Sequence, residues 1–199
     1  MPRSRALILL TVLAPVFAAH AGQTGQVISI DTSENIYIDN VPANSDLSEL
    51  AKQRGPLFLR VDARKRSEAM CRVLVAATTR PTFLGQPKNL TKSIPIGLAP
   101  SIEAAGAIPV TAKAVGSSWT FESDSIIVHI DFDGTMTWNL SALLSSATLD
   151  ERFDELAVQR PHARIYIQPD KLSKTADVEN VAASAKRNGF SNITIACPK

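Results

Sequence analysis

The chain has 199 residues, and its 21 Lys and Arg against 19 Asp and Glu give a formal net charge of +2. Both excess cations, Arg3 and Arg5, lie in residues 1–21. Without them the chain is neutral, which excludes the basic surface of a general nucleic-acid binder. Hydrophobic residues make up 45% and charged residues 20%, which excludes a disordered protein. Two cysteines are too few for a disulfide framework or a structural zinc site, but they suffice for one bridge.

Residues 1–21 have the three parts of a secretory signal peptide. A basic start at residues 3–5 precedes an apolar segment at residues 6–16, and Ala19-His20-Ala21 fits the A-x-A cleavage pattern. An uncleaved membrane anchor is the alternative, but a helical span needs about 20 apolar residues. We therefore expect cleavage after Ala21, a product without a membrane span, and a periplasmic or secreted location.

Two predicted β-hairpins follow at corresponding places in the two halves of the chain. Val27–Asp31 and Ile36–Ile38 flank the first polar turn, and Ile127–Asp131 and Met136–Trp138 flank the second. Apolar residues alternate along these segments, as in half-buried strands. The second turn contains Asp133-Gly134, a strong hairpin signal because glycine tolerates a positive φ.

Each hairpin precedes a predicted helix and a strand. Asp46-x-x-Glu49 and Thr148-x-x-Glu151 fit the capping-box pattern that opens a helix. The strands Leu57–Val61 and Ala163–Ile167 follow. The same order of elements in both halves indicates a degenerate internal repeat.

A second helix follows each of these strands. We predict these helices at Glu68–Ala77 and Ala176–Asn188, and a closing strand at Asn192–Cys197. In the later helix, Asp177 and Glu179 lie near the positive end of the helix dipole, which favours acidic side chains.

These elements predict an α+β fold of two related modules, each of the type β-β-α-β-α(-β), with helices packed on small mixed sheets. We expect a first, divergent module at residues 22–77 and a second at residues 126–199. Residues 78–125 contain five prolines and are predicted to be an insertion or linker. Within it, Ile108–Ala112 would supply the strand that the first module lacks.

The second module resembles the periplasmic domain of the ExbD/TolR family from Ile126 to the end of the chain. The resemblance rests on Asp133-Gly134, the Leu149–Leu156 helix, Gln168-Pro169-Asp170, the helix ending at Gly189 and the strand after it. The first half looks like a more divergent copy. The resemblance implies a binding role without a cofactor, in contact with envelope proteins or a peptidoglycan-like polymer.

The resemblance also has a clear departure. Members of that family carry a transmembrane helix with an acidic residue that works in a proton-driven motor. Residues 1–21 contain no Asp or Glu, so no residue can be given that role. A structural dimerisation module, acting as a homodimer, is a further interpretation.

Ile127–Thr135 also resembles the first motif of haloacid-dehalogenase-type phosphatases, an apolar strand followed by D-x-D-G-T. That family would make Asp131 the nucleophile and Asp133 the general acid/base. The segment from Asp131 to Lys199 is too short for the rest of such a domain, and no later acidic pair for Mg²⁺ follows it. A hairpin explains the same residues, so the phosphatase is the second interpretation and we expect no enzyme.

His129, Asp131 and Asp133 would share one face of a regular strand. Three such donors would begin a divalent-metal site. A ligand set normally needs a donor from elsewhere in the chain, so we interpret these residues as the solvated face of a hairpin and predict no metal site.

The segment around the end of the Leu57–Val61 strand is rich in basic side chains, namely Arg60, Arg64, Lys65, Arg66 and Arg72. They would form an anion site for cell-wall polymer, lipid headgroups or an acidic partner. Asp62 and Glu68 neutralise part of this charge, and the alternative is a solvated loop. Arg60, Arg64, Lys65 and Arg66 are the binding candidates.

The two cysteines are both predicted to point inward. Cys197 follows Ile193 and Ile195 with the period of a strand, and Cys71 lies at the margin of the apolar stripe of its helix. An exported protein meets oxidising conditions, so we predict a Cys71–Cys197 disulfide between the two halves. The alternative is two separately buried thiols.

Overall fold

The structure is a computed structural model that describes residues 26–31, 33–43, 47, 50, 57–62, 64–80, 88–89, 94–98, 108–116, 120–140 and 142–199. The expected signal peptide and the expected helix at Asp46-x-x-Glu49 lie outside the described residues, apart from Leu47 and Leu50, which are buried. In the part of the chain that is described, no helix is long and apolar enough to cross a membrane.

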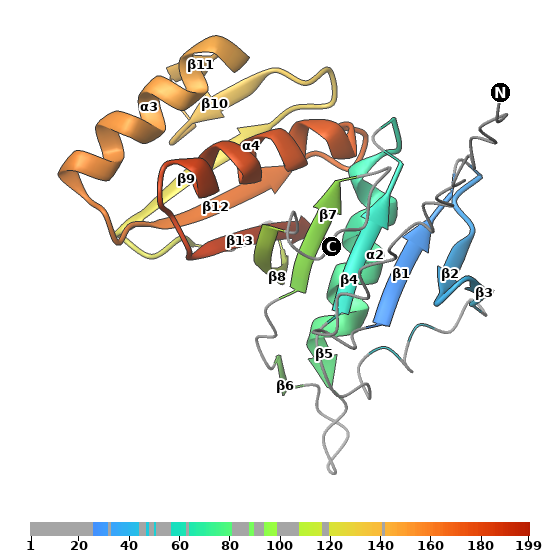
Figure 1. Cartoon of the computed structure of the whole chain (residues 1–199). Coiled ribbons are helices and arrows are strands. Elements are labelled where there is room, and N and C mark those ends of the chain that lie inside the picture. Colours follow the sequence, from blue (N-terminus) through green and yellow to red (C-terminus); the bar gives the residue numbers. More distant parts are fainter. Residues whose placement is uncertain are drawn as a thin grey trace, which may run out of the picture.

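The strands of the first half of the chain form a sheet, and one described helix lies against one face of it (Figure 1). Its elements are β1 (Gln26–Ile30), β2 (Ile36–Ile38), β3 (Val41–Pro42), β4 (Leu57–Val61), α2 (Ser67–Thr78) and β7 (Ile94–Leu98). Between α2 and β7, the short strands β5 (Thr79–Arg80) and β6 (Lys88–Asn89) pair with each other.

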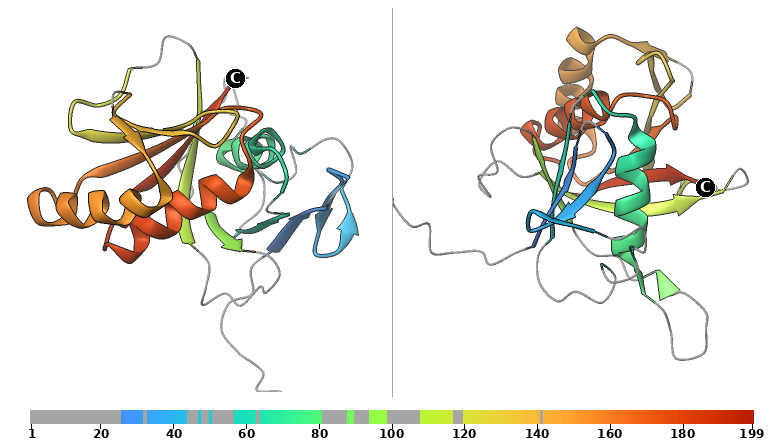
Figure 2. Two further views of the ribbon diagram at one scale, coloured as in Figure 1. Left: turned by 90° about the horizontal axis from the view of Figure 1, so that it is seen from above. Right: turned by 90° about the vertical axis from the view of Figure 1, so that its right-hand side faces the viewer.

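Among the described elements, the second half has the same order of three strands, a strand, a helix and a last strand, with an additional helix between its third and fourth strands. It consists of β9 (Ser125–Ile130), β10 (Met136–Trp138), β11 (Ala142–Leu144), α3 (Ser146–Gln159), β12 (Arg164–Pro169), α4 (Thr175–Arg187) and β13 (Ile193–Pro198). Figure 2 shows α3 and α4 side by side over this half of the sheet, with α2 beside the other half. The fold is therefore α+β, as the sequence predicted.

The strand order of the two halves is the same. Neighbouring strands run β3-β2-β1-β4-β7 in the first half and β11-β10-β9-β12-β13 in the second. In both, the hairpin strands are antiparallel and the later strands pair in parallel. The strand β8 (Ile108–Val115) joins the two halves into one continuous sheet, because it pairs antiparallel with β7 and parallel with β13.

The strand predicted at Ile108–Ala112 was therefore placed wrongly. The parallel neighbour of β4 is β7, and Ile108–Ala112 belongs to β8, the connecting strand. Prolines concealed β7 in the sequence, because a proline cannot donate a hydrogen bond to a sheet. Pro95 of β7 and Pro109 of β8 lie opposite each other in the register of these two strands.

The two hairpins contain corresponding hydrogen bonds between a strand amide and a turn side chain. The amide of Val27 donates to Asp39 Oδ1 (2.9 Å), and the amide of Ile127 donates to Asn139 Oδ1 (3.0 Å). Asp39 and Asn139 both have positive φ, 50° and 51°. Each opens a tight turn into a third strand, β3 or β11, which the sequence analysis did not predict.

The helix boundaries follow from their caps. The helix α3 begins earlier than the pattern Thr148-x-x-Glu151 predicted, because Ser145 is its N-cap and Thr148 is the third helical residue. The Thr148 amide donates to Ser145 Oγ (3.2 Å), and the Ser145 amide donates to Thr148 Oγ1 (3.0 Å). At the end of α4, Asn188 is the C-cap and Gly189 has a φ of +89°.

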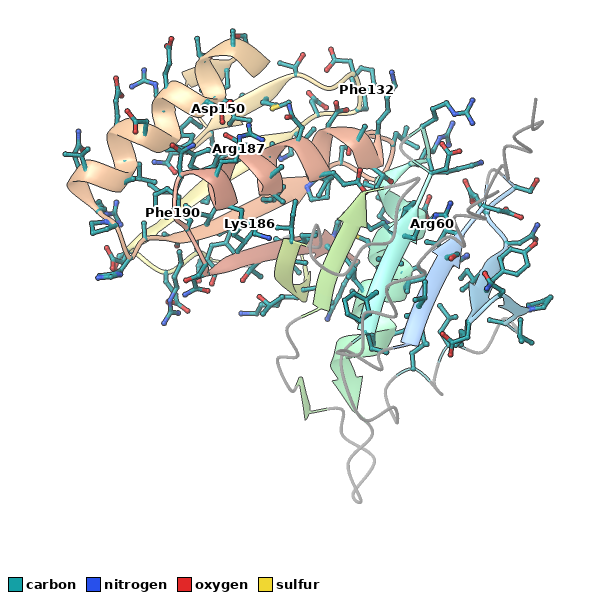
Figure 3. All side chains as sticks on the ribbon, in the orientation of Figure 1. Arg60, Phe132, Asp150, Lys186, Arg187 and Phe190 are labelled. Atoms are coloured by element: carbon teal, nitrogen blue, oxygen red, sulfur yellow. A yellow bond between two sulfur atoms is a disulfide. The ribbon has the colours of Figure 1, made fainter. Side chains whose placement is uncertain are left out.

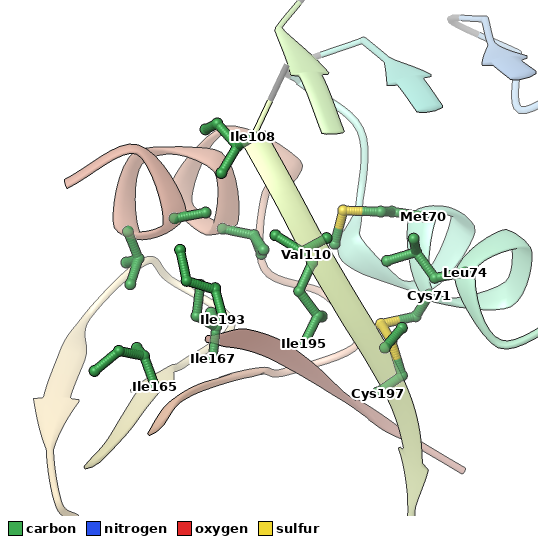
Figure 4. Close-up of a cluster of buried hydrophobic side chains, with 14 of the residues drawn as sticks. Met70, Cys71, Leu74, Ile108, Val110, Ile165, Ile167, Ile193, Ile195 and Cys197 are labelled. Atoms are coloured by element: carbon green, nitrogen blue, oxygen red, sulfur yellow. A yellow bond between two sulfur atoms is a disulfide. The ribbon is translucent and has the colours of Figure 1, made fainter. Parts of the chain in front are cut away.

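The two halves share one buried core and a disulfide. Ile193, Ile195 and Cys197 alternate along β13 and belong to the same cluster as residues of α2 and β8 (Figure 4). Cys71 of α2 is bonded to Cys197, with 5.4 Å between their α-carbons. The bridge therefore joins the first half to the last strand of the second, as the sequence predicted.

Candidate binding site

The outer face of the first half presents a row of three polar side chains. Ser29 on β1 lies opposite Tyr37 on β2 and Arg60 on β4 in the registers of those strand pairs. Ile28 and Ile30 are buried, so the residue between them faces away from the core. The three side chains therefore lie together on the face opposite the helix.

A pocket of about 460 Å³ lies over this row. It is lined by Ser29, Ile30, Asp31, Tyr37, Asn40, Arg60 and Asp62. Figure 3 shows Arg60 on β4, close to β1. Among the described residues, the structure shows no hydrogen bond or ion pair to the Arg60 side chain, so within that part of the chain its guanidinium donors face the pocket without a protein acceptor.

Asp31 forms one wall of the pocket, and both oxygens of its carboxylate accept hydrogen bonds from the protein. Oδ1 accepts the amides of Ser33 (2.7 Å) and Asn35 (2.9 Å). Oδ2 accepts the side-chain amide of Asn35 (3.0 Å) and the hydroxyl of Tyr37 (3.1 Å). The Asn35 side chain is the main cause that holds the pKa of Asp31 below its ordinary value, and the bond to Asp31 raises the pKa of Tyr37.

Asp62, the second acidic residue of the pocket, is paired with Arg64. Arg64 donates from Nη2 to Oδ2 (3.0 Å), and from Nε (3.1 Å) and its backbone amide (2.9 Å) to Oδ1. The side-chain bonds of Arg64 lower the pKa of Asp62 to about 2. Arg64 is therefore neutralised, whereas the described residues provide no acidic partner for Arg60.

The predicted basic cluster is thus divided by the fold. Arg60 faces the pocket, Arg64 is bound to Asp62, and Lys65 and Arg66 lie in the loop that precedes α2. A ligand carboxylate in the pocket would meet the Arg60 guanidinium and the Ser29 hydroxyl. Of the two pocket acids, Asp62 is paired with the cationic Arg64, whereas Asp31 accepts only neutral donors and keeps its negative charge on the pocket wall.

The corresponding row in the second half has a different composition. His129 lies opposite Thr137 and Gln168 in the registers of β10 and β12. The His129 Nδ1 atom is buried, and the described residues provide it with no hydrogen-bond partner. Next to this row, the ring of Phe121 packs edge-on against Tyr166, with 5.6 Å between the centroids.

The D-x-D-G-T segment is the hairpin turn between β9 and β10. Asp131 accepts the amide of Phe132 (2.8 Å), and Asp133 accepts the amide of Thr135 (2.8 Å), which lowers the pKa of Asp133. Gly134 has a φ of +88°, which favours glycine. Both carboxylates are exposed. Asp133 lies in the turn and not on the strand, so it does not share a strand face with His129.

No group of three or more His, Cys, Asp or Glu side chains in the described residues is arranged to hold a metal ion. Asp131 and Asp133 each accept a backbone amide within the turn.

Glu179 is buried, which the sequence analysis did not predict. It lies in the N-terminal half of α4, as expected, but it is only 2% exposed. Its Oε1 atom is buried without a hydrogen-bond partner among the described residues, and burial raises its pKa to about 7. The signal was available, since Val178, Ala182 and Ala185 place Glu179 beside the apolar stripe of α4.

The later part of the chain matches a known protein family. The family model described as "Biopolymer transport protein ExbD/TolR" matches residues 91–199, which is more than half of the chain. The match begins before β7 and so covers more than the segment from Ile126 onward that the sequence analysis expected. No curated protein matches the chain.

Proposed function

Because the chain belongs to the ExbD/TolR family, we propose that it is an exported, non-catalytic binding module of the cell envelope. In this proposal the pocket at Arg60 contacts a peptidoglycan-like polymer or an envelope protein. Support for the location comes from the signal-peptide pattern of residues 1–21. Intact-mass measurement of protein from its native host would then give Gly22 as the first residue.

The observation that supports a binding role most directly is the guanidinium of Arg60, which faces an open pocket and has no acceptor among the described residues. An arginine that lacks a protein acceptor offers two parallel donors to a carboxylate. Ser29 adds a hydroxyl group on the same strand face, whereas the Tyr37 hydroxyl already donates to Asp31. Carboxylates are abundant on the peptides of cell-wall polymer and on proteins, so this pocket suits either partner.

We also propose that the chain contains two copies of one module. The repeated strand order and the repeated hairpin bonds support this view. The first copy would then extend beyond residue 77 to include β7, and β8 would be the connection between the copies.

Co-sedimentation with purified cell-wall sacculi tests the polymer form of the proposal. We expect the mature protein to bind and Arg60→Ala to bind at least tenfold more weakly. Arg152→Ala is the matched control, because it removes an exposed arginine on α3 that is paired with Glu155 (3.1 Å). Equal binding by Arg60→Ala and the parent protein would exclude the pocket.

Site-specific cross-linking in the native host tests the protein form. A photoreactive residue at Ser29 should capture an envelope protein, and Arg60→Ala should reduce that product. The same photoreactive residue at Thr137, the corresponding row of the second half, is the control. Equal products from both positions would show that the pocket is not selective.

A further inference from the structure

The loops that precede the second helix of each half meet in a reciprocal backbone contact. The amide of Ser67 donates to the carbonyl of Ser173 (2.8 Å), and the amide of Thr175 donates to the carbonyl of Lys65 (2.7 Å). Arg66 and Lys174 lie between these bonds and face each other as an antiparallel β-bridge. The backbone positions of Arg66 and Lys174 are therefore held by two hydrogen bonds.

The side chains of Arg66 and Lys174 point toward solvent. Their neighbours Ser67, Ser173 and Thr175 are completely buried, and alternate residues of an extended segment point to opposite sides. Arg66 and Lys174 are accordingly exposed. The hydrogen bonds flank this pair, which is the arrangement that brings opposite α-carbons to about 4.5 Å and their side chains closest together.

Two like charges opposite each other on neighbouring strands repel and destabilise the pair. Among the described residues, the structure shows no ion pair for Arg66 or Lys174. Of the nearby acids, Asp62 forms an ion pair with Arg64, whereas Asp170 accepts only the neutral amide of Leu172 (2.7 Å) and keeps its charge.

The other charged groups around this pair do not add to its positive charge. Lys65 and Lys171 are two further cations, and they stand against three acids, namely Asp170, Glu68 in the first turn of α2 and Asp177 in the first turn of α4. The backbone thus holds Arg66 and Lys174 together at a cost in stability, and the two cations are the local source of positive charge.

We propose that Arg66 and Lys174 together bind a dianionic oxyanion, specifically a phosphate group. One phosphate monoester carries about 1.5 to 2 negative charges at neutral pH and balances both cations, whereas one carboxylate balances only one. The arginine supplies a planar pair of donors and the lysine a point charge. This site is separate from the pocket at Arg60 and does not rest on the function proposed for that pocket.

Thermal unfolding in buffers of equal ionic strength, with inorganic phosphate or with chloride, tests the site. Phosphate should raise the melting temperature of the parent protein and of the control Arg152→Ala. Arg66→Ala and Lys174→Ala should each lose that increase.

The repulsion between the two cations predicts a second, independent result. Without phosphate, Arg66→Ala and Arg66→Glu should melt about 1–3 °C above the parent protein, because the like-charge pair is removed. An equal phosphate effect on Arg66→Ala and the parent, or no phosphate effect on the parent, would overturn the proposal. So would a lower melting temperature of both Arg66 variants in chloride.

Vesicles distinguish a phosphate carried by a lipid from free phosphate. If the site accepts a lipid headgroup, the parent protein should bind vesicles that contain phosphatidic acid but not vesicles of phosphatidylcholine alone, and Lys174→Ala should bind at least tenfold more weakly. Binding to inorganic phosphate alone would assign the site to a soluble phosphate. Binding to neither would overturn the proposal.

Discussion

The fifth residue of α2 and the fifth residue of α4 occupy the same place in the two halves, but they affect the stability of the fold in opposite directions. Cys71 is 5% exposed and is bonded to Cys197. Glu179 is 2% exposed and leaves Oε1 without a partner among the described residues. One half thus carries a disulfide cysteine at the position where the other carries a buried acid. Equivalent backbone positions in the two halves therefore contribute differently to the stability of the fold.

The hairpin turns show a second difference of this kind. In the first half Glu34 adopts a φ of 65°, and the Asp31 carboxylate accepts two backbone amides across the turn. In the second half Gly134 occupies the corresponding position, with a φ of +88°. A side-chain network therefore supports in one half a backbone conformation that glycine provides in the other.

Loss of the disulfide should have the largest effect on stability. We expect Cys71→Ala/Cys197→Ala to lower the free energy of unfolding by on the order of 4 kcal/mol, because the bond closes a long loop in the unfolded chain. Urea unfolding of the variant and of the parent under non-reducing conditions measures the difference. An unchanged midpoint would mean that packing alone holds the two halves together.

Replacing Glu179 should have the next largest effect and should depend on pH. Its pKa is about 7 in the folded chain and near 4.5 when unfolded, so the folded state binds the proton more tightly. The resulting stability is fully present below about pH 4.5 and is lost as the pH rises through 7. At pH 8, Glu179→Gln should be more stable than the parent by roughly 3 kcal/mol.

Urea unfolding between pH 4 and pH 8 measures this slope. Glu151→Gln, an exposed residue of α3, is the matched control and should retain the slope of the parent. A parallel pH profile for Glu179→Gln would show that Glu179 is not the group responsible.

A side chain at Gly134 should have a smaller effect, confined to the second hairpin. Gly134→Val should lower the free energy of unfolding by about 2 kcal/mol, because a β-branched residue resists this φ. Its Cβ would also lie 3.2 Å from Asp177 Oδ2. Chemical denaturation gives the value, with Thr135→Val as the adjacent control. In the first half, Glu34→Gly should instead be neutral or stabilising.

The smallest expected effect concerns phosphatase activity. Asp133→Asn should leave any release of phosphate from p-nitrophenyl phosphate unchanged, because Asp133 holds the Thr135 amide in a turn. The assay is run with the mature protein and Mg²⁺. A Mg²⁺-dependent activity that Asp131→Asn abolishes would contradict the binding-module interpretation and revive the phosphatase.

The sequence by itself determined the elements whose signals are local. Alternating apolar residues marked the hairpin strands β1, β2, β9 and β10, and Asp133-Gly134 marked the second turn. The charges at its two ends placed α4 close to its observed bounds, and α2 was predicted as its counterpart in the first half. The disulfide was also accessible, because two cysteines allow a single pairing and both were predicted to point inward.

The tertiary structure alone decided everything that depends on distant strands. β3 and β11 are too short to show a period, and β7 carries a proline, so only their pairing partners reveal them. Which basic residue faces a pocket was likewise hidden. Arg60, Arg64 and Arg66 are the same residue type, so residue type does not distinguish them. Strand register directs Arg60 outward, and Asp62 neutralises Arg64. The contact between two loops places Arg66 opposite Lys174. The positions of Arg60 and Arg66 depend on contacts between residues far apart in the chain, which local propensity does not encode, whereas Asp62 and Arg64 are only two residues apart.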